Sequence, residues 1–200
     1  MKVLELFAGS RSFSKVAEEM GMETFTTDFK PFDKIDYVVD FMDFNINKLP
    51  FKPDIIWASP PCTRYSIAGI RFHRVNKVPY SEFALKSDDM MVKLLQMIKE
   101  LNPKYYFIEN PRGVLRKMDF MQNVGIRHTV TYCQYGDNRM KPTDIWTNST
   151  NWKPKKICKN GMPCHESAPR GSQTGTQGLK VNYARSIVPY ELCKEILESL

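Results

Sequence analysis

Two short segments of the sequence hold residue types that can do covalent chemistry. Cys62 ends the run Ser59-Pro60-Pro61-Cys62, and Glu109 follows the apolar run Tyr105-Tyr106-Phe107-Ile108. A proline pair after a buried strand fixes an extended turn and presents the next side chain at the edge of the sheet. A thiolate there is a nucleophile when cationic neighbours lower its pKa, and a partly buried carboxyl with a raised pKa can share a proton with a ring nitrogen. The plainer interpretations are a buried apolar cysteine and a glutamate that pairs with Arg112 in a structural turn.

A second set of residues has the types that bind a nucleoside-like ligand. Phe7-Ala8-Gly9-Ser10 follows an apolar run, and a small residue in such a turn lets a ligand approach the backbone. Asp28 comes about nineteen residues after Gly9, at the end of the next strand-like run, where an acid can accept hydrogen bonds from ribose hydroxyls. Asp40 or Asp43 could bind an adenine amino group. Each of these aspartates could equally cap a helix or close a turn.

The pattern of apolar residues predicts the elements that position these groups. Five strands are expected at Lys2–Phe7, Glu23–Thr27, Tyr37–Val39, Asp54–Ala58 and Lys104–Ile108, and a hairpin at His128–Gln134 with Asp144–Thr147. Helices are expected from the residues after Gly9 to about Met20, over Ser87–Leu101, and from Pro189 onward, because apolar residues recur there at helical spacing.

This alternation of strands and helices predicts an α/β fold, with a mostly parallel sheet, helices on both faces and an antiparallel C-terminal hairpin. Ligands of such sheets bind outside the carboxyl ends of the strands. The carboxyl ends of the first five expected strands hold, in turn, Gly9, Asp28, Asp40, Cys62 and Glu109. The sequence therefore predicts one site at one edge of the sheet for both sets of residues.

The composition is that of a folded protein. A chain of 200 residues with 42% hydrophobic and 12% aromatic content fits a single domain and argues against disorder. No apolar run is long enough to span a membrane, and the first residues do not form a signal peptide. We therefore expect a cytoplasmic protein whose five cysteines stay reduced.

Positive charge is concentrated in two stretches that lack acidic residues. The formal net charge is +7, which suits a polyanionic partner. The stretch from Thr63 to Tyr80 contains Arg64, Arg71 and Arg74, and the stretch from Lys153 to Cys164 contains Lys153, Lys155 and Lys156. Both flank catalytic candidates, so we expect phosphate contacts from them rather than two merely solvated loops.

The remaining cysteines could suggest a metal site. Cys158, Cys164 and His165 lie close together in the sequence, and Cys133 could join them. Because the spacing is not that of a Cys-x-x-Cys pair, we expect no metal. Cys193 lies on the apolar side of the last helix, which predicts a core residue.

The order of these motifs resembles that of the DNA (cytosine-5) methyltransferases. Phe7-Ala8-Gly9 resembles the first motif of that family, Pro61-Cys62 resembles its catalytic Pro-Cys pair, and Glu109-Asn110 resembles its Glu-Asn-Val motif. The segment from Tyr135 to Pro142, which contains Arg139 and Lys141, is similar to the family's basic motif. The segment from Tyr183 to Pro189 is similar to the final motif, whose helix packs beside the first. Small phage-encoded or prophage-encoded members match best.

The resemblance implies a Rossmann-like enzyme that uses S-adenosylmethionine to methylate cytosine in double-stranded DNA. Cys62 would add to C6 of the base so that C5 becomes electron-rich, and Glu109 would hold the proton at N3. Asn110 would orient the glutamate or its loop, and Arg139 would contact the base carbonyl or the catalytic loop. The target base would have to be flipped out of the duplex. Cofactor contacts would come from Phe7, Ala8, Gly9, Ser10, Asp28, Asp40, Asp43, Pro61, Arg185 and Ser186.

The region available for target recognition is short. Members of the family have a long recognition region, whereas here only residues 149–182 can serve, as a loop-rich insert in a single domain of residues 1–200. We expect phosphate contacts from Arg170 and Lys141, and base contacts from Gln173 and Gln177. A short target sequence or an accessory specificity protein is expected, with the chain itself a monomer.

Three other functions fit parts of the pattern. Ser59-Pro60-Pro61 resembles the Ser-Pro-Pro-aromatic motif of enzymes that methylate cytosine N4 or adenine N6, although Cys62 stands where their aromatic residue would be. The same C5 chemistry could act on RNA. A DNA-binding protein that has lost catalysis is the third alternative, since Arg11 and Ser12 replace two glycines of the family's first motif.

Overall fold

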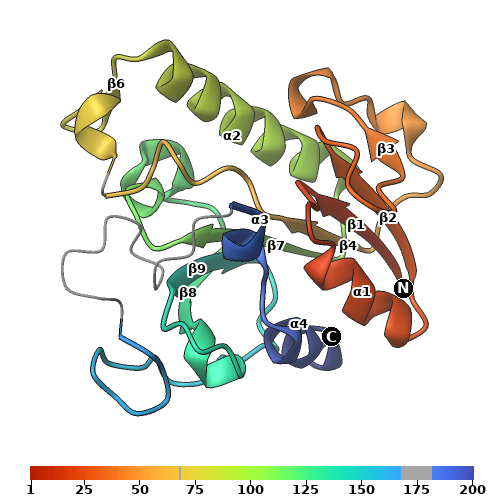
Figure 1. Cartoon of the computed structure of the whole chain (residues 1–200). Coiled ribbons are helices and arrows are strands. Elements are labelled where there is room, and N and C mark those ends of the chain that lie inside the picture. Colours follow the sequence, from red (N-terminus) through yellow and green to blue (C-terminus); the bar gives the residue numbers. More distant parts are fainter. Residues whose placement is uncertain (68, 168–181) are drawn as a thin grey trace.

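A seven-stranded sheet forms the centre of the computed structural model, which describes residues 1–67, 69–167 and 182–200 (Figure 1). The strand order is β3-β2-β1-β4-β7-β9-β8. The strands are β1 (Lys2–Leu6), β2 (Glu23–Asp28), β3 (Tyr37–Val38), β4 (Ile55–Ala58), β7 (Tyr105–Pro111), β8 (Ile126–Thr131) and β9 (Pro142–Thr147).

The strand directions confirm the expected mixed sheet. β1, β2, β3, β4 and β7 run parallel to one another, while β9 pairs antiparallel with both β7 and β8. The expected hairpin is therefore present, and its second strand, β9, lies next to β7. Because β9 extends the pairing with Asn110 and Pro111, β7 runs past Ile108, where the sequence pattern ended it.

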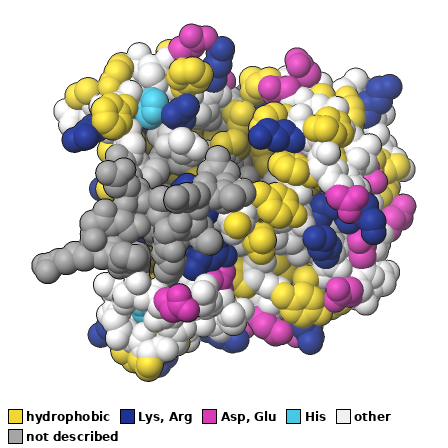
Figure 2. All heavy atoms as spheres, viewed as in Figure 1, with side chains coloured by type: hydrophobic (Ala, Val, Ile, Leu, Met, Phe, Trp, Pro, Cys, Tyr) yellow, Lys and Arg dark blue, Asp and Glu magenta, His cyan; other side chains and the backbone are white. Residues whose placement is uncertain are grey.

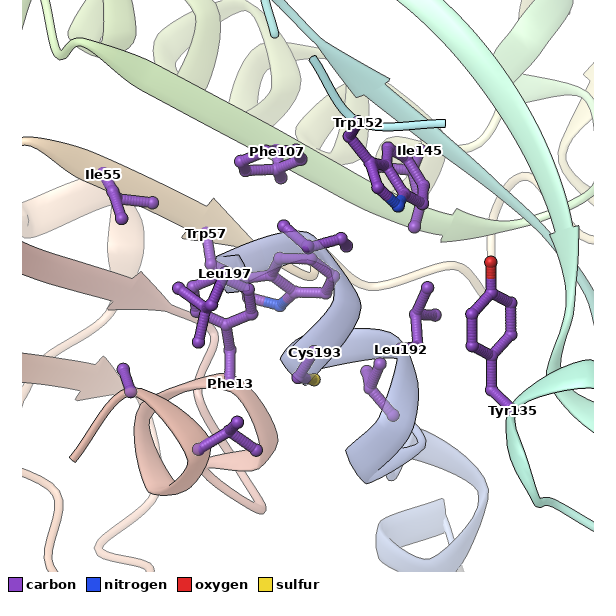
Figure 3. Packing of buried hydrophobic residues seen from close by; sticks show 14 of the residues in the cluster. Phe13, Ile55, Trp57, Phe107, Tyr135, Ile145, Trp152, Leu192, Cys193 and Leu197 are labelled. Atoms are coloured by element: carbon purple, nitrogen blue, oxygen red, sulfur yellow. The ribbon is translucent and has the colours of Figure 1, made fainter. Parts of the chain in front are cut away.

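Helices cover both faces of the sheet (Figure 1). α1 (Ser12–Glu19) and α4 (Tyr190–Glu198) pack together on one face, where Phe13, Leu192 and Leu197 meet Trp57 and Phe107 of the strands (Figure 3). α2 (Glu82–Leu101) covers the other face through Met91, Leu94 and Ile98. Adjacent strand residues point to opposite faces, so that both clusters are buried against the same strands, and this apolar burial is the main force that holds the layers together.

α2 begins five residues earlier than its apolar pattern indicated. Ser81 caps the helix by accepting a hydrogen bond from the Ala84 amide (3.2 Å), and Glu82 lies in the first turn, where an acid favours the helix dipole. The apolar periodicity missed this first turn because Phe83 and Leu85 are exposed. Across the described residues no helix combines the length and the apolarity needed to cross a membrane.

Several short elements complete the chain. The antiparallel pair β5 (Arg74–Val75) and β6 (Val78–Pro79) and the helix α3 (Asn182–Ser186) had no sequence signal. β8 ends at Thr131, three residues before its expected end, because a 3-10 turn follows that Gly136 closes with a positive φ. The 3-10 turns are η1 (Phe41–Asp43), η2 (Ile46–Lys48), η3 (Ile70–Phe72), η4 (Leu115–Lys117), η5 (Asp119–Met121) and η6 (Tyr132–Tyr135).

A buried carboxylate joins β1 to the start of α1. Glu5 is 2% exposed and accepts hydrogen bonds from the amides of Phe13 (3.3 Å) and Ser14 (2.7 Å). These amides belong to the first turn of α1, which has no capping side chain of its own. Burial raises the Glu5 pKa to about 6, and the hydrogen bonds from Ser14 and Phe13 oppose that rise. Glu5 thereby fixes the turn between β1 and α1.

We expect Glu5 to make the stability of the protein fall as the pH rises from about 4.5 to about 7. The folded chain keeps the Glu5 proton to a higher pH than the unfolded chain does, so ionisation disfavours folding across that window by about 2 kcal/mol. Urea unfolding at a series of pH values should show this decrease relative to Glu5→Gln, which cannot titrate. If the difference between the two proteins is the same at both ends of the window, Glu5 titrates normally.

Candidate active site

Four strands end at the same level of the sheet. Leu6 pairs with Thr27 and with Ala58, and Ala58 pairs with Ile108, so these residues form one row across β2, β1, β4 and β7. The residues that follow the row at the carboxyl edge are Phe7, Asp28, Ser59 and Glu109. The structure therefore brings the two predicted sets of residues to one edge.

A buried hydrogen bond holds the proline turn against β7. The side-chain amide of Asn110 donates to the Pro60 carbonyl at 2.9 Å, and Asn110 is 1% exposed. Cys62 follows this turn and is half-buried. Asn110 thus positions the turn, while the charge of its neighbour Glu109 acts on the Cys62 thiol.

Glu109 is buried among a phenol and an ammonium group. Its Oε1 accepts a hydrogen bond from the Tyr132 hydroxyl at 2.8 Å, and the Lys141 Nζ lies 4.0 Å from the same oxygen. Lys141 also lies over the Tyr132 ring, 4.4 Å from its centroid, and donates to the Arg185 carbonyl at 2.9 Å. These contacts fix the carboxylate at the sheet edge and partly balance its charge.

Burial raises the pKa of the Cys62 thiol, and the negative charge of Glu109 raises it further. The positive charges of Lys141 and Arg185 oppose these effects. The thiol is therefore protonated at neutral pH as long as Glu109 is charged. Neutralising Glu109 would leave burial as the only one of these two causes of the raised pKa, and would therefore favour the thiolate.

The basic residue nearest Glu109 in the structure is Lys141, and Arg139 lies in an internal ion pair. Arg139 is 6% exposed and forms an ion pair with Asp137, and its guanidinium also donates to the Ala184 carbonyl at 3.1 Å. It therefore ties the segment before β9 to α3. Lys141, assigned from sequence to phosphate contact, is the cation beside Glu109. Tyr132 was not singled out at all, because an apolar strand pattern does not distinguish a tyrosine with a polar role.

The turn after β1 has an unusual backbone. Phe7, Gly9 and Arg11 all have positive φ angles, and the Gly9 amide donates to Asp28 Oδ2 at 3.0 Å. A positive φ in Phe7 and Arg11 is strained, and such strain persists where the surrounding structure imposes it. Asp28 is 8% exposed and also accepts from the Lys30 amide at 3.0 Å. This hydrogen bond joins the glycine turn after β1 directly to Asp28 at the end of β2.

The segment from Tyr183 to Pro189 contacts the turn between β1 and α1. Ser12 Oγ bonds to Ser10 Oγ at 2.7 Å and accepts from the Val188 amide at 3.1 Å, so the two ends of the chain meet beside the glycine turn. In α3 the Ser186 hydroxyl donates to the Tyr183 carbonyl at 2.8 Å. The Tyr183 ring lies 5.6 Å from that of Phe32, which follows β2.

The two aspartates proposed for an adenine group lie on the surface. Asp40 and Asp43 are both exposed, and Asp40 accepts a hydrogen bond from the Met42 amide at 2.8 Å as the cap of η1. The structure therefore shows Asp40 as a helix cap. The cap uses one oxygen of its carboxylate.

The basic residues differ in their availability for phosphate. Arg74 is 3% exposed and forms a bidentate ion pair with Asp88, so its charge is used inside the protein. Arg64 bonds to His73 at 2.8 Å and lies over the Phe83 ring, whereas Arg71 is exposed. Lys153, Lys155 and Lys156 are exposed as well. Three further candidates, Arg170, Gln173 and Gln177, lie outside the described residues.

Fold and sequence comparisons point to the same class of protein. The chain shares its fold with a solved protein described as a putative DNA modification methyltransferase encoded within a prophage (E. coli), at a TM-score of 0.56 and 14% identity over 79% of this chain and 52% of the other. It thus spans about half the length of that protein. The architecture is the Rossmann-like methyltransferase fold.

The sequence defines the family within that fold. A family model of C-5 cytosine-specific DNA methylases matches residues 1–126, and the chain belongs to this family. A protein of Frog virus 3 (isolate Goorha), described as a probable DNA (cytosine-5)-methyltransferase, is 28% identical over 180 residues, which are 84% of this chain and 81% of the viral protein.

We expect the pKa of Cys62 to follow the two charges beside it, in opposite directions. Glu109→Gln should lower the pKa of the thiol, because it removes a negative neighbour, and Lys141→Gln should raise it. The pH dependence of iodoacetamide alkylation at Cys62, followed by peptide mass spectrometry, measures both shifts. Glu198→Gln, on the exposed end of α4, is the matched control and should change neither. Equal midpoints in all four proteins would mean that these charges do not act on the thiol.

Proposed function

We propose that the protein transfers a methyl group from S-adenosylmethionine to C5 of a cytosine in DNA, with Cys62 as the covalent nucleophile. The observation that supports this most directly is the common edge of β4 and β7. The Asn110 side chain donates to the Pro60 carbonyl there, and the buried Glu109 lies close enough for its charge to act on the pKa of the Cys62 thiol. A nucleophile and a proton donor side by side suit an addition to a ring that must be protonated at the same time.

The residues at the ends of β1 and β2 fit the cofactor. A side-chain carbon built on Gly9 would lie 3.8 Å from the Asp28 carboxylate, so the glycine leaves the backbone open to a ligand beside that acid. Each Asp28 oxygen accepts one backbone hydrogen bond, and a carboxylate has about four acceptor positions, so positions remain for ribose hydroxyls. When bound there, S-adenosylmethionine supplies an electrophilic methyl group. Phe7, Ala8 and Ser10 belong to the same turn, and we include Pro61, Arg185 and Ser186 in the proposed cofactor site because the resemblance to the family implies them.

At the base, the chain's own groups act on C6 and N3. The Cys62 sulfur forms a bond to C6, the proton of the thiol passes by way of the Glu109 carboxylate to N3, and the resulting enamine makes C5 nucleophilic. While Glu109 holds this proton in a hydrogen bond to N3, its negative charge no longer raises the pKa of the thiol, so binding of the base to a protonated Glu109 favours the thiolate. After methylation, C5 loses its proton to water and the sulfur leaves C6.

Tyr132 and Lys141 act through Glu109. The hydroxyl of Tyr132 and the ammonium group of Lys141 both approach Oε1, which holds the carboxyl in one rotamer and fixes the direction in which its proton points. Both are positioning residues. Arg139 holds the segment that contains Lys141, through Asp137 and the Ala184 carbonyl.

The loop after Cys62 has the composition of a surface that contacts an opened duplex. Ile67 is 70% exposed and Phe72 is 59% exposed, and Arg71 lies over the Phe72 ring. In Figure 2, apolar and basic side chains gather at the upper left, over the region where Figure 1 labels β6. Exposed apolar side chains can fill the space that a flipped base leaves, while arginine holds the backbone phosphates.

Replacement of the nucleophile tests the proposed reaction. We expect Cys62→Ser to abolish methyl transfer and to leave the binding of S-adenosylhomocysteine unchanged, because no cofactor residue depends on the thiol. Glu109→Gln should slow the transfer by about 10²- to 10⁴-fold. Single-turnover transfer to DNA and to RNA, followed by nucleoside mass spectrometry, gives the rate and the product, and calorimetry gives the binding.

The same measurements distinguish the alternatives. Cys62→Ser within tenfold of the unaltered protein would exclude covalent catalysis. N4-methylcytosine or N6-methyladenine as product would identify amino-methylation. 5-methylcytosine found in RNA and not in DNA would show that RNA is the substrate. Tight DNA binding with no transfer by the unaltered protein would identify an inactive relative.

Salt dependence of DNA binding tests the loop. We expect Arg71→Ala to weaken binding and to lower the slope of log affinity against log salt by about one, because one phosphate contact is lost. Arg127→Ala is the matched control, since Arg127 is also exposed but lies on β8, the outer strand of the sheet, and not in the loop that follows β4. An equal effect of both substitutions would mean that the loop has no special contact with the phosphates.

A further inference from the structure

Three thiols and an imidazole lie together where η6 meets the insert that follows β9. Cys133 comes from η6, while Cys158, Cys164 and His165 come from the insert that follows β9. One possible ligand atom from each of the four residues lies within 4.8 Å of the others. Cys133 is buried, Cys158 and His165 are half-buried and Cys164 is exposed. No residue of this group takes part in the proposed methyl transfer.

The distances from the imidazole to two of the sulfurs match a tetrahedral metal site. The Nδ1 of His165 lies 3.6 Å from the sulfur of Cys158 and 3.6 Å from that of Cys164. A tetrahedral zinc ion with Zn–S of about 2.3 Å and Zn–N of about 2.0 Å puts sulfur and nitrogen about 3.5 Å apart. The distance from the imidazole nitrogen to each of these two sulfurs is therefore close to the distance between two ligands of one zinc ion.

The group is not a disulfide. The sulfurs of Cys158 and Cys164 are 3.2 Å apart, well beyond the roughly 2.05 Å of a disulfide bond, and all five cysteines are free. Thiols are weak hydrogen-bond donors and acceptors, so mutual contact gives them little stabilisation. A shared cation would replace these weak contacts with four strong ones.

We propose that Cys133, Cys158, Cys164 and His165 bind one structural Zn²⁺ ion. Three thiolates and one imidazole form a closed four-ligand set, which zinc prefers in structural sites and which leaves no open position for catalysis. The set has a formal charge of −1 with the ion bound. The stretch from Lys153 to Cys164 contains Lys153, Lys155, Lys156 and Lys159 and no acidic residue. Its positive charge is therefore complementary to the negative charge of the zinc-bound set.

The ion would fasten the insert to the sheet. Among the hydrogen bonds that hold the insert here, the Cys158 amide donates to Thr131 Oγ1 at 2.8 Å, and the Glu166 amide donates to the Asn138 carbonyl at 2.9 Å. Asn138 is adjacent to Arg139, so the ion would also stabilise the segment that leads to Lys141. Zinc binding would therefore order the start of the insert without touching the reacting atoms.

The sequence favoured no metal, and the fold brings together four residues that lie apart in the sequence. Cys158, Cys164 and His165 lack the Cys-x-x-Cys spacing, and the fourth ligand precedes them by 25 residues. Cys133 reaches the group because β8 ends at Thr131 and η6 turns the chain back toward the insert.

Metal analysis of the full chain tests this proposal. The protein, purified under reducing conditions without a metal-binding tag, should contain about one zinc per chain by plasma mass spectrometry. Cys158→Ser and Cys164→Ser should each reduce the content to less than about a tenth. Cys62→Ser and Cys193→Ser are the matched controls and should keep the zinc, because both cysteines lie outside the group.

Cobalt gives a second readout that does not depend on the folding of any variant. Co²⁺ added to the metal-free chain should produce a thiolate-to-cobalt charge-transfer band and the strong visible bands of a tetrahedral site, and Zn²⁺ should displace both. Removal of zinc should speed tryptic cleavage after Lys156 and Lys159. A chain that binds less than about a tenth of an equivalent after reconstitution, or one with a Cys158–Cys164 disulfide under reducing conditions, would overturn the proposal.

Discussion

The hydrogen bond from the Asn110 amide to the Pro60 carbonyl is the contact on which the site depends. Pro60 and Pro61 have no N–H group, so their turn cannot be held by amide donors of its own and needs one from outside. Asn110 supplies that donor from the neighbouring strand at 2.9 Å, in a buried position where a hydrogen bond is strong. Loss of this bond would free the turn while the sheet stayed intact.

The charges around this contact are coupled, and their balance sets the state of the thiol. Glu109 and Lys141 lie 4.0 Å apart in a region that excludes most solvent, so a change in either is felt at Cys62. The free protein keeps an unreactive thiol because burial raises the pKa of Cys62 and a negative Glu109 would raise it further. A ligand that neutralises Glu109 changes both groups together, which restricts the reactive thiolate to the complex.

The sequence predicted the parts of the site that depend on parallel strands. Cys62 and Glu109 meet because β4 and β7 are adjacent and end at one edge, and apolar runs identify such strands. The neighbours Tyr132 and Lys141 could not be predicted, since they reach Glu109 only because β9 inserts between β7 and β8. Likewise, no local pattern indicates that Asp88 takes the charge of Arg74, a partner fourteen residues away in the next helix.

The three tryptophans of the chain have a practical consequence. Trp57, Trp146 and Trp152 are at most 2% exposed, so their fluorescence reports on the interior and not on solvent contact. The indole N–H of Trp57 donates to the Ser59 hydroxyl at 2.9 Å, next to the proline turn, whereas that of Trp152 donates to Glu195 at 3.0 Å on α4. Trp57 is therefore an intrinsic optical probe of the turn, and the other two provide its internal reference.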